Sequence, residues 1–337
     1  MESTSHKPVT FTYNAKDMIT MKHTVKELRL MIFLTLIVGC FSSIAQQDAQ
    51  YTQFMYNTVA INPAYAGNRG MLSAIALHRS QWVGLDGAPV TQSVSVHSPI
   101  GLGNVGLGFS VVNDKIGPAS ETYGNIDFSY SIDVGYESRL SFGLKAGGHL
   151  LNVDLQSLEL PNQNDPRFQQ NVENNFSPNI GAGVYFHTNR FYIGASAPNM
   201  LRNEHFQASN DPTGASFIAV ERVHYYLTSG YVFDISDNIQ LKPATMVKAV
   251  AGSPLQADVN LSMLYAEKLT LGASYRWSAA LSGLVGYQVN DQVLIGIAYD
   301  RETTALGNTN FNSGSYEAFI RFELQRDYTR METPRFF

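Results

Sequence analysis

The sequence is almost free of cysteine: its 337 residues include one, Cys40. Cys40 lies in an apolar run, Met31–Phe41, that we expect to be removed with an export signal. The mature chain would then have no disulfide, no thiol nucleophile and no thiolate metal site. An exported chain of this size without cysteine must take its stability from a large core or from a closed sheet.

Residues 21–45 have the pattern of a secretory signal peptide. Its parts are the basic residues Lys22, Lys26 and Arg29, the apolar run 31–41, and the small residues of Ser43-Ile44-Ala45. We favour cleavage after Ala45, because the small residues there follow a complete apolar region; a lipoprotein cleavage box at Ile37–Cys40 is the alternative. The run is too short to span a membrane. Residues 1–20 are interpreted as an upstream extension, with the true start at Met21.

The chain also lacks an excess of basic charge and lacks helical periodicity. Its net charge of −5 argues against a nucleic-acid-binding protein, which needs a basic face. Apolar and polar residues alternate instead, which indicates strands with two different faces. In 316–324, for example, Tyr316, Ala318 and Ile320 alternate with Glu317 and Arg321.

Fourteen such runs are predicted as strands: 71–82, 89–98, 104–112, 121–133, 138–151, 179–187, 191–197, 219–233, 238–250, 254–265, 269–277, 280–289, 292–300 and 314–324. Most have about the ~9–11 residues that a tilted strand needs to cross a bilayer, and their number is even. Connections after even-numbered strands are short, whereas 152–178, 198–218 and 301–313, after odd-numbered strands, are long. This sorting predicts an all-β outer-membrane antiparallel β-barrel with both termini in the periplasm.

The two faces of the predicted strands differ in chemistry. Aromatic residues stand at the ends of the apolar faces of several strands, as expected at membrane interfaces. They are Tyr231, Phe233, Tyr275, Trp277, Tyr287 and Tyr299. The opposite face carries charges of both signs: Asp127, Lys145, Lys242, Lys248, Asp258, Arg276, Glu317, Arg321 and Glu323. We expect the charged face to line the lumen, where mixed charges can pair across the barrel or contact a plug.

Motifs of catalysis and cofactor binding are missing. Gly101–Gly106 matches G-x-G-x-x-G, but the glycines run into a strand and not a helix, so a tight turn is predicted. His149 and His224 fall on inward faces without metal-ligand spacing, and the acidic loop after 152 lacks the order of a calcium loop. No catalytic residue, cofactor site or metal site is predicted, and the protein is expected not to be an enzyme.

Several blocks resemble the PorP/SprF family of type IX secretion membrane proteins. They are QYTQFMYNTVAINPAYAG, RSQWVGLDGAPVTQSVSVHSPIG, VGLGFSVVNDKIGPAS, LSFGLKAGGHLLNVDLQSLEL, PNIGAGVYF, FYIGASAPNML and the terminal TPRFF, in family order and over nearly the whole mature chain. The resemblance implies an outer-membrane barrel of a Gram-negative bacterium that works in secretion or surface anchoring of adhesins and in gliding motility. It implies type IX components and an adhesin C-terminal domain as partners. The candidate family-motif residues are Gln81, Trp82, Asp86 and Gly87.

A barrel of fourteen strands encloses a lumen too wide for side chains alone to fill. Residues 46–70 are predicted to fold back as a plug, with a periplasmic docking segment as the alternative. Tyr51, Phe54 and Met55 would share one side of a helical turn. The candidate plug motif is Asn62, Pro63, Ala64 and Gly67: Asn62-Pro63 disfavours helix, and Gly67 with Gly70 permits the reversal into the first strand.

The predicted organisation is therefore an extension at 1–20, a signal peptide at 21–45, a plug at 46–70, a barrel at 71–324 and a periplasmic tail at 325–337. Two other functions stay open. Fatty-acid-transporter barrels also carry an NPA turn in an N-terminal hatch, so a transporter of hydrophobic small molecules is the first alternative. The largely polar inward faces disfavour it. A soluble periplasmic β-protein is the second alternative, which would have to bury every apolar face.

Overall fold

The structure, a computed structural model, describes residues 50–101, 103–158, 171–201, 222–309 and 311–324. The predicted extension, signal peptide and tail lie outside these residues, as do residues 46–49 and most of the acidic loop after 152. Within the described ranges, no helix has both the length and the apolar character that crossing a membrane requires.

The described chain is built almost wholly of strands. They are β1 (Leu72–Ser80), β2 (Val90–Ile100), β3 (Val105–Ile116), β4 (Ala119–Gly135), β5 (Ser138–Val153), β6 (Val172–Thr188), β7 (Phe191–Ala197), β8 (His224–Tyr231), β9 (Phe233–Ser236), β10 (Ile239–Val250), β11 (Gln256–Tyr265), β12 (Leu269–Arg276), β13 (Ala280–Asn290), β14 (Val293–Glu302) and β15 (Ser315–Leu324). The short helical turns are α2 (Thr58–Ile61), η1 (Pro63–Tyr65), η2 (Leu155–Ser157) and η4 (Ala305–Asn308).

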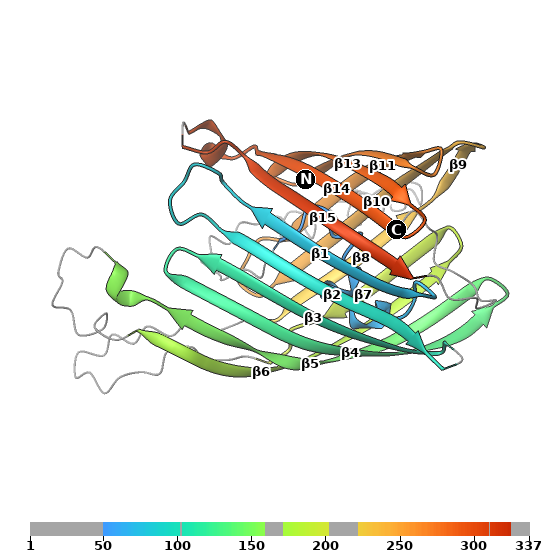
Figure 1. Ribbon diagram of the computed structural model, residues 1–337, viewed down its shortest axis with the longest axis horizontal. Helices are drawn as coiled ribbons and strands as arrows, with labels where there is room; N and C mark the ends of the chain where they lie inside the picture. The colour runs from blue at the N-terminus through green and yellow to red at the C-terminus, as the bar shows by residue number, and fades with distance from the viewer. Residues whose placement is uncertain (1–49, 102, 159–170, 202–221, 310, 325–337) are drawn as a thin grey trace, which may run out of the picture. The chain divides into compact units, whose positions relative to one another are not determined.

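These strands form one antiparallel sheet that closes on itself (Figure 1). β1 pairs with both β2 and β15, and β10 pairs with both β8 and β11, so the ring has no open end. β8 and β9 both pair with β10 and are separated only by Val232, so they act as one interrupted strand. Counted in this way, the fifteen strands make a barrel of fourteen, which confirms the predicted fold.

Two boundaries differ from the prediction. β6 begins at Val172, well before the expected 179, and pairs with β5 as far as Val153. Residues 172–178 do not alternate in polarity, which hid them from the periodicity argument, but backbone pairing needs no apolar face. β3 and β4 likewise extend to a tight turn at Gly117-Pro118, where a longer connection was expected.

The connections separate by length at the two ends of the barrel. At one end, here the short-turn end, they span at most four residues: 101–104, 136–137, 189–190, 237–238, 266–268 and 291–292. At the other, the long-loop end, they include 81–89, 154–171, 198–223 and 303–314, together with the short turns 117–118, 251–255 and 277–279. Outer-membrane barrels place short turns in the periplasm and longer loops outside the cell.

The two faces of the barrel wall are as predicted. Large apolar side chains are exposed on the outer face, such as Ile126 and Ile297 at about 60 % of their surface. The nine charged residues predicted to face inward are all buried. The exposed rings form two belts: Tyr275, Trp277 and Tyr299 near the long-loop end, and Tyr231, Phe233 and Tyr287 near the short-turn end. An apolar outer wall between aromatic belts suits a bilayer, not a soluble sandwich.

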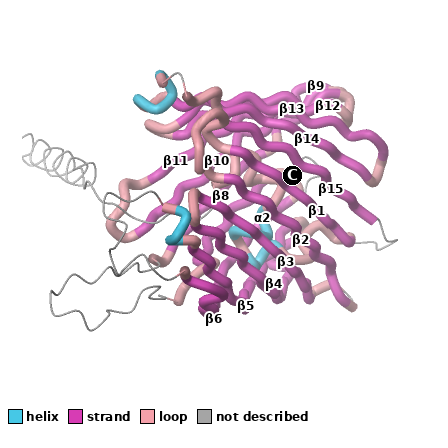
Figure 2. The backbone as a smooth tube through the Cα atoms, turned by 60° about the vertical axis from the view of Figure 1, so that its left-hand side comes forward, coloured by secondary structure: helices cyan, strands magenta, loops and turns pink. Residues whose placement is uncertain are grey.

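Residues 50–71, here the lumen segment, lie inside this wall (Figure 2). The segment is buried over nearly its whole length and joins β1 at the short-turn end. Its start lies at the opposite end, because Gln50 Nε2 donates to Oε1 of Gln256, the first residue of β11, at 3.1 Å. The barrel strands do begin and end at the short-turn end, as predicted. The described segment therefore runs down the lumen from the long-loop end and reverses into β1.

Candidate functional site in the barrel lumen

An ion network fixes the start of the lumen segment to the wall formed by β1, β14 and β15. Arg79 Nη2 contacts Asp300 Oδ2 at 2.6 Å, and Arg79 Nη1 contacts Glu317 Oε2 at 3.1 Å. All three side chains are almost completely buried. Sequence analysis placed Glu317 in the lumen, but it missed Arg79 and Asp300, although each has the inward parity of its strand.

The lumen segment completes this network. The backbone N–H groups of Thr52 and Gln53 each donate to the Glu317 carboxylate at 2.9 Å. The Thr52 hydroxyl donates to Asp300 Oδ2 at 2.5 Å and accepts from Arg79 Nη1 at 2.7 Å. A buried ion group is tolerated when opposite charges pair and further hydrogen bonds support the pairs. The network therefore joins the segment to three strands; we call it the charged anchor.

An apolar cluster lies beside the charged anchor. Tyr51, Phe54 and Met55 are buried together as predicted, although the helical turn α2 begins only at Thr58. They pack with wall residues Ile75, Leu77, Tyr226, Met246, Leu294 and Phe319. Their burial removes apolar surface from water at about 25 cal/mol per Å². The first half of the segment is thus held by charge and by hydrophobic packing together.

A second ion group closes the segment at the short-turn end. Arg69 Nη2 contacts Glu323 Oε1 at 2.7 Å, and Arg321 Nε contacts the same oxygen at 3.2 Å. The Arg321 guanidinium also lies over the Tyr56 ring, 5.7 Å from its centroid. Burial by itself lowers the pKa of Arg69, but Glu323 and Tyr65 together outweigh burial and hold that pKa above its usual range. Burial raises the pKa of Tyr56, so its phenol stays neutral.

The predicted turn motif lies between these two anchors. α2 ends at Ile61, and Asn62 is extended with φ −138° and ψ 108°, as expected for a residue before proline. Asn62 Oδ1 accepts from the backbone N–H of Ala64 at 3.0 Å, and its Nδ2 donates to the Val184 carbonyl at 3.1 Å. Asn62 therefore caps its own turn and fixes that turn to β6; Pro63 and Ala64 begin η1.

Glycines of the wall make room for this turn. A Cβ at Gly143 would lie 2.1 Å from Ala64 N, and one at Gly183 would lie 2.2 Å from Asn62 Oδ1. A Cβ at Gly106 would lie 2.1 Å from the Ala66 carbonyl oxygen. These glycines come from β3, β5 and β6, and they let the turn approach the wall backbone. Only a tight turn at Gly101–Gly106 was predicted for these glycines, because nothing local in the sequence shows what each glycine faces.

Wall side chains satisfy the backbone of the segment around the turn. The contacts are Ser196 Oγ to the Ile61 carbonyl at 2.7 Å, Ser129 Oγ to the Ala66 carbonyl at 2.6 Å, Lys145 Nζ to the Ala60 carbonyl at 3.4 Å, and Gly67 N to His97 Nδ1 at 3.2 Å. Buried peptide groups need such partners when they belong to no helix or sheet. We call this glycine- and serine-lined area of β3–β7 the small-residue wall.

Gly67 and Gly70 make the predicted reversal. Both have φ of 73°, in the left-handed region that glycine enters without strain. The Gly67 Cα also leaves no room for a side chain, because an added Cβ would lie 2.7 Å from Gly106 Cα. All four candidate plug residues, Asn62, Pro63, Ala64 and Gly67, therefore lie together against the small-residue wall.

The other sequence candidates lie elsewhere. Gln81, Trp82, Asp86 and Gly87 belong to the β1–β2 connection at the long-loop end, away from the turn. Gly101–Gly106 forms the predicted tight turn and the start of β3. His149 and His224 are inward and buried; the His149 ring is tilted against Tyr123, and the His224 ring is stacked on Tyr226. Among the described residues no group of three potential ligands is arranged for a metal ion.

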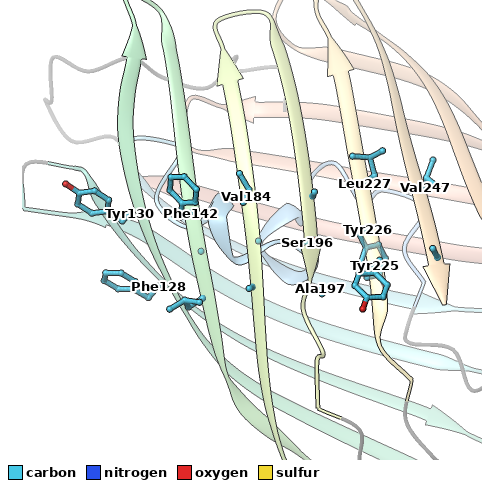
Figure 3. Close-up of a pocket in the computed structure, with 16 residues that line it drawn as sticks. Phe128, Tyr130, Phe142, Val184, Ser196, Ala197, Tyr225, Tyr226, Leu227 and Val247 are labelled. Carbon is cyan, nitrogen blue, oxygen red and sulfur yellow. The ribbon is translucent and has the colours of Figure 1, made fainter. Parts of the chain in front are cut away.

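Two cavities show where ligands or partners could fit. A polar cavity of about 930 Å³, here called the vestibule, opens at the short-turn end, and Tyr56 and Arg69 of the lumen segment are among its lining residues. An apolar hollow of about 860 Å³ lies on the outer wall of β4–β8 and β10, with Phe128, Tyr130, Phe142 and Tyr225 around it (Figure 3). The pale-blue lumen segment lies behind this wall in Figure 3. Of these two cavities, the one in the lumen is polar and the apolar one faces outward.

Known proteins resemble the chain only at low identity, apart from one family. A comparison with curated proteins gave no match. Solved structures similar to the chain include a Pseudomonas aeruginosa FadL homologue (12 % identity, TM-score 0.43, covering 80 % of this chain and 94 % of that one) and the CymD monoaromatic hydrocarbon channel (12 %, 0.43, 81 % and 100 %). The NanC porin is similar at 10 % identity and a TM-score of 0.39, covering 75 % of this chain and 100 % of that one.

At such identities and TM-scores these structures add no functional argument. Residues 43–322 match the family described as Type IX secretion system membrane protein PorP/SprF. That range takes in the whole lumen segment and nearly all of the barrel. The chain therefore belongs to the PorP/SprF family of type IX secretion system membrane proteins.

Proposed function

We propose that this protein is a closed, non-enzymatic outer-membrane barrel of type IX secretion. It secretes or anchors adhesins at the cell surface, in support of gliding motility, through protein–protein contacts. Its partners are other type IX components and the C-terminal domain of a secreted adhesin; it sits in outer-membrane lipid and uses no cofactor or nucleic acid. The long-loop end faces outside the cell, and the vestibule faces the periplasm.

The observation that carries the proposal is the way the lumen segment is held. It is fixed by a charged anchor near the long-loop end, by the small-residue wall in the middle and by Arg69–Glu323 near the short-turn end. A conduit needs a mobile or absent obstruction, whereas this segment has bonded partners along its length. We infer that Gln47–Ala66 is a plug and that the barrel works through its two surfaces.

Transport of hydrophobic small molecules is the rival function, and the chemistry of the lumen argues against it. Ligand sites for such molecules are mostly apolar, with few polar groups. The vestibule has Arg69, Arg321 and Glu323 among its lining residues, and the apolar hollow lies on the outer wall. A hydrophobic molecule would therefore meet charged groups on the lumen path.

Deletion of Gln47–Ala66 tests the proposal. The strands and their pairing do not depend on these residues, so the variant should still show heat-modifiable gel mobility. The outer membrane should become permeable to small antibiotics, since no ring of side chains spans a barrel this wide. Adhesin display should fall, because the segment would no longer position a partner. A folded variant with unchanged permeability and unchanged display would contradict the proposal.

A further inference from the structure

The connection between β1 and β2 is held rigidly by its neighbours. Residues 81–89, here the Trp82 loop, lie at the long-loop end. Four backbone hydrogen bonds fix the loop: Gln81 N to Pro89 O at 2.9 Å, Val83 N to Gly314 O at 2.9 Å, Ser313 N to Val83 O at 2.8 Å, and Gly117 N to Gly87 O at 2.9 Å. The loop is therefore joined to the β14–β15 connection on one side and to the β3–β4 turn on the other.

The backbone of this loop is strained at a bulky residue. Trp82 has φ of 47°, in the left-handed region where large side chains are outliers. Its N–H donates to Ser315 Oγ at 3.2 Å, and Leu85 N donates back to the Trp82 carbonyl at 3.0 Å. Such strain persists only where the surroundings over-determine it, and it concentrates at ligand clamps and functional loops. The surroundings of Trp82 thus hold the loop in one conformation.

The loop exposes apolar side chains beyond the aromatic belt. The Tyr299 and Tyr316 rings, 5.1 Å apart, lie at the long-loop ends of β14 and β15 and mark the membrane interface. Val83 and Leu85 follow β1, Phe311 lies in the β14–β15 connection, and the three are 37 %, 38 % and 70 % exposed. The two connections that carry these side chains lie side by side, since a Cβ on Gly84 would lie 2.8 Å from the Phe311 carbonyl oxygen. Because these side chains lie beyond the aromatic belt, they face water and not lipid. Apolar side chains grouped on a water-exposed surface mark interaction sites.

We propose that the Trp82 loop and Phe311 form the surface on which the barrel holds a secreted protein at the outside of the cell. This inference rests on the proposed function and names the surface that would perform it. The exposed Asp86 carboxylate forms no ion pair within the described part of the chain, so the matching partner surface carries apolar side chains beside a Lys or Arg. A preformed loop loses little conformational freedom on binding, which favours such docking.

A double substitution, Val83→Ser with Leu85→Ser, tests the surface without adding charge. The loop backbone bonds are retained, so the variant should reach the outer membrane at the parental level and keep the cells impermeable. Adhesin display on intact cells should fall at least tenfold. Tyr136→Ser is the matched control, because Tyr136 is 99 % exposed but lies in a short-turn-end connection; it should leave display unchanged. Full display by the double variant would overturn the inference.

A strain lacking the whole protein separates the two proposals. If that strain displays adhesin normally, the proposed function fails and this inference fails with it. If display is lost there but the double variant restores it fully, only the Trp82 loop is wrong. A photo-crosslinking residue at Leu85 identifies the occupant: a crosslink to the adhesin C-terminal domain supports the inference. A crosslink to lipopolysaccharide, or to a second copy of the barrel, overturns it.

Discussion

The two walls that hold the lumen segment do so by different physics. On one side, Arg79 of β1, Asp300 of β14 and Glu317 of β15 are buried and bond to Thr52 and Gln53. On the other side, β3–β7 offer glycines that admit the Asn62–Ala64 turn and serines that bond to its carbonyls. The first contact depends on charge and the second on the absence of side chains.

This difference has a consequence for how each wall tolerates change. A buried ion network fails when one member is removed, because the remaining charges lose their compensation. A small-residue wall fails when something is added, because packed interiors have no spare volume. The lumen segment is therefore sensitive to removal of a charge at the first wall and to added side-chain volume at the second. Substitutions of each kind can measure the two contributions separately.

The largest effect is expected at the charged anchor. Arg79→Ala leaves Asp300 and Glu317 buried without their cation, which costs about 3–5 kcal/mol when a buried pair is broken. The urea midpoint of the purified barrel in detergent should fall accordingly, and antibiotic uptake by intact cells should rise as the start of the segment detaches. Adding Asp300→Asn and Glu317→Gln removes the stranded charges and should restore part of the midpoint. An unchanged midpoint in the single variant would show that the anchor contributes nothing.

An intermediate effect is expected at the small-residue wall. In Gly143→Val the new Cβ would lie 2.1 Å from Ala64 N, which is a steric clash. Overpacking of this kind lowers the free energy of unfolding by about 1–3 kcal/mol. The strand itself should form, because valine suits β-structure better than glycine does, so heat-modifiable mobility should be retained while permeability increases. Gly283→Val is the control, since a Cβ there meets nothing within 4 Å. Equal permeability in both variants would place the turn away from β5.

The strand faces and the turn residues could be predicted from local sequence, whereas the contacts between the lumen segment and the wall could not. Alternation identified the lipid and lumen faces, as at Ile297 and Glu317, because a strand has a period of two whatever its neighbours. Asn62-Pro63 and Gly67 were predictable for the same reason: their backbone limits are local. The bond from Gln53 to Glu317 joins residues 264 positions apart, so it depends on ring closure and register. The end of the barrel at which the lumen segment starts could not be predicted for the same reason.

The smallest effect is expected at a single hydroxyl of the small-residue wall. Ser196 Oγ donates to the Ile61 carbonyl at 2.7 Å, the last carbonyl of α2 before the turn. Ser196→Ala removes this donor without adding volume, and one hydrogen bond of this kind contributes about 1 kcal/mol. The urea midpoint should fall slightly while permeability stays low, because the charged anchor and the glycine contacts are intact.

Ser110→Ala is the matched control for that change. Ser110 is also a buried serine of the lumen face, but its Oγ has no hydrogen-bond partner among the described residues. Removing an unbonded buried hydroxyl should leave the midpoint unchanged or raise it, since such a group carries a desolvation cost without a compensating bond. The difference between the two alanine variants then isolates the contact with the turn. If Ser110→Ala lowers the midpoint as much as Ser196→Ala does, the small-residue wall holds the turn by volume alone, and its serines contribute no specific bonds.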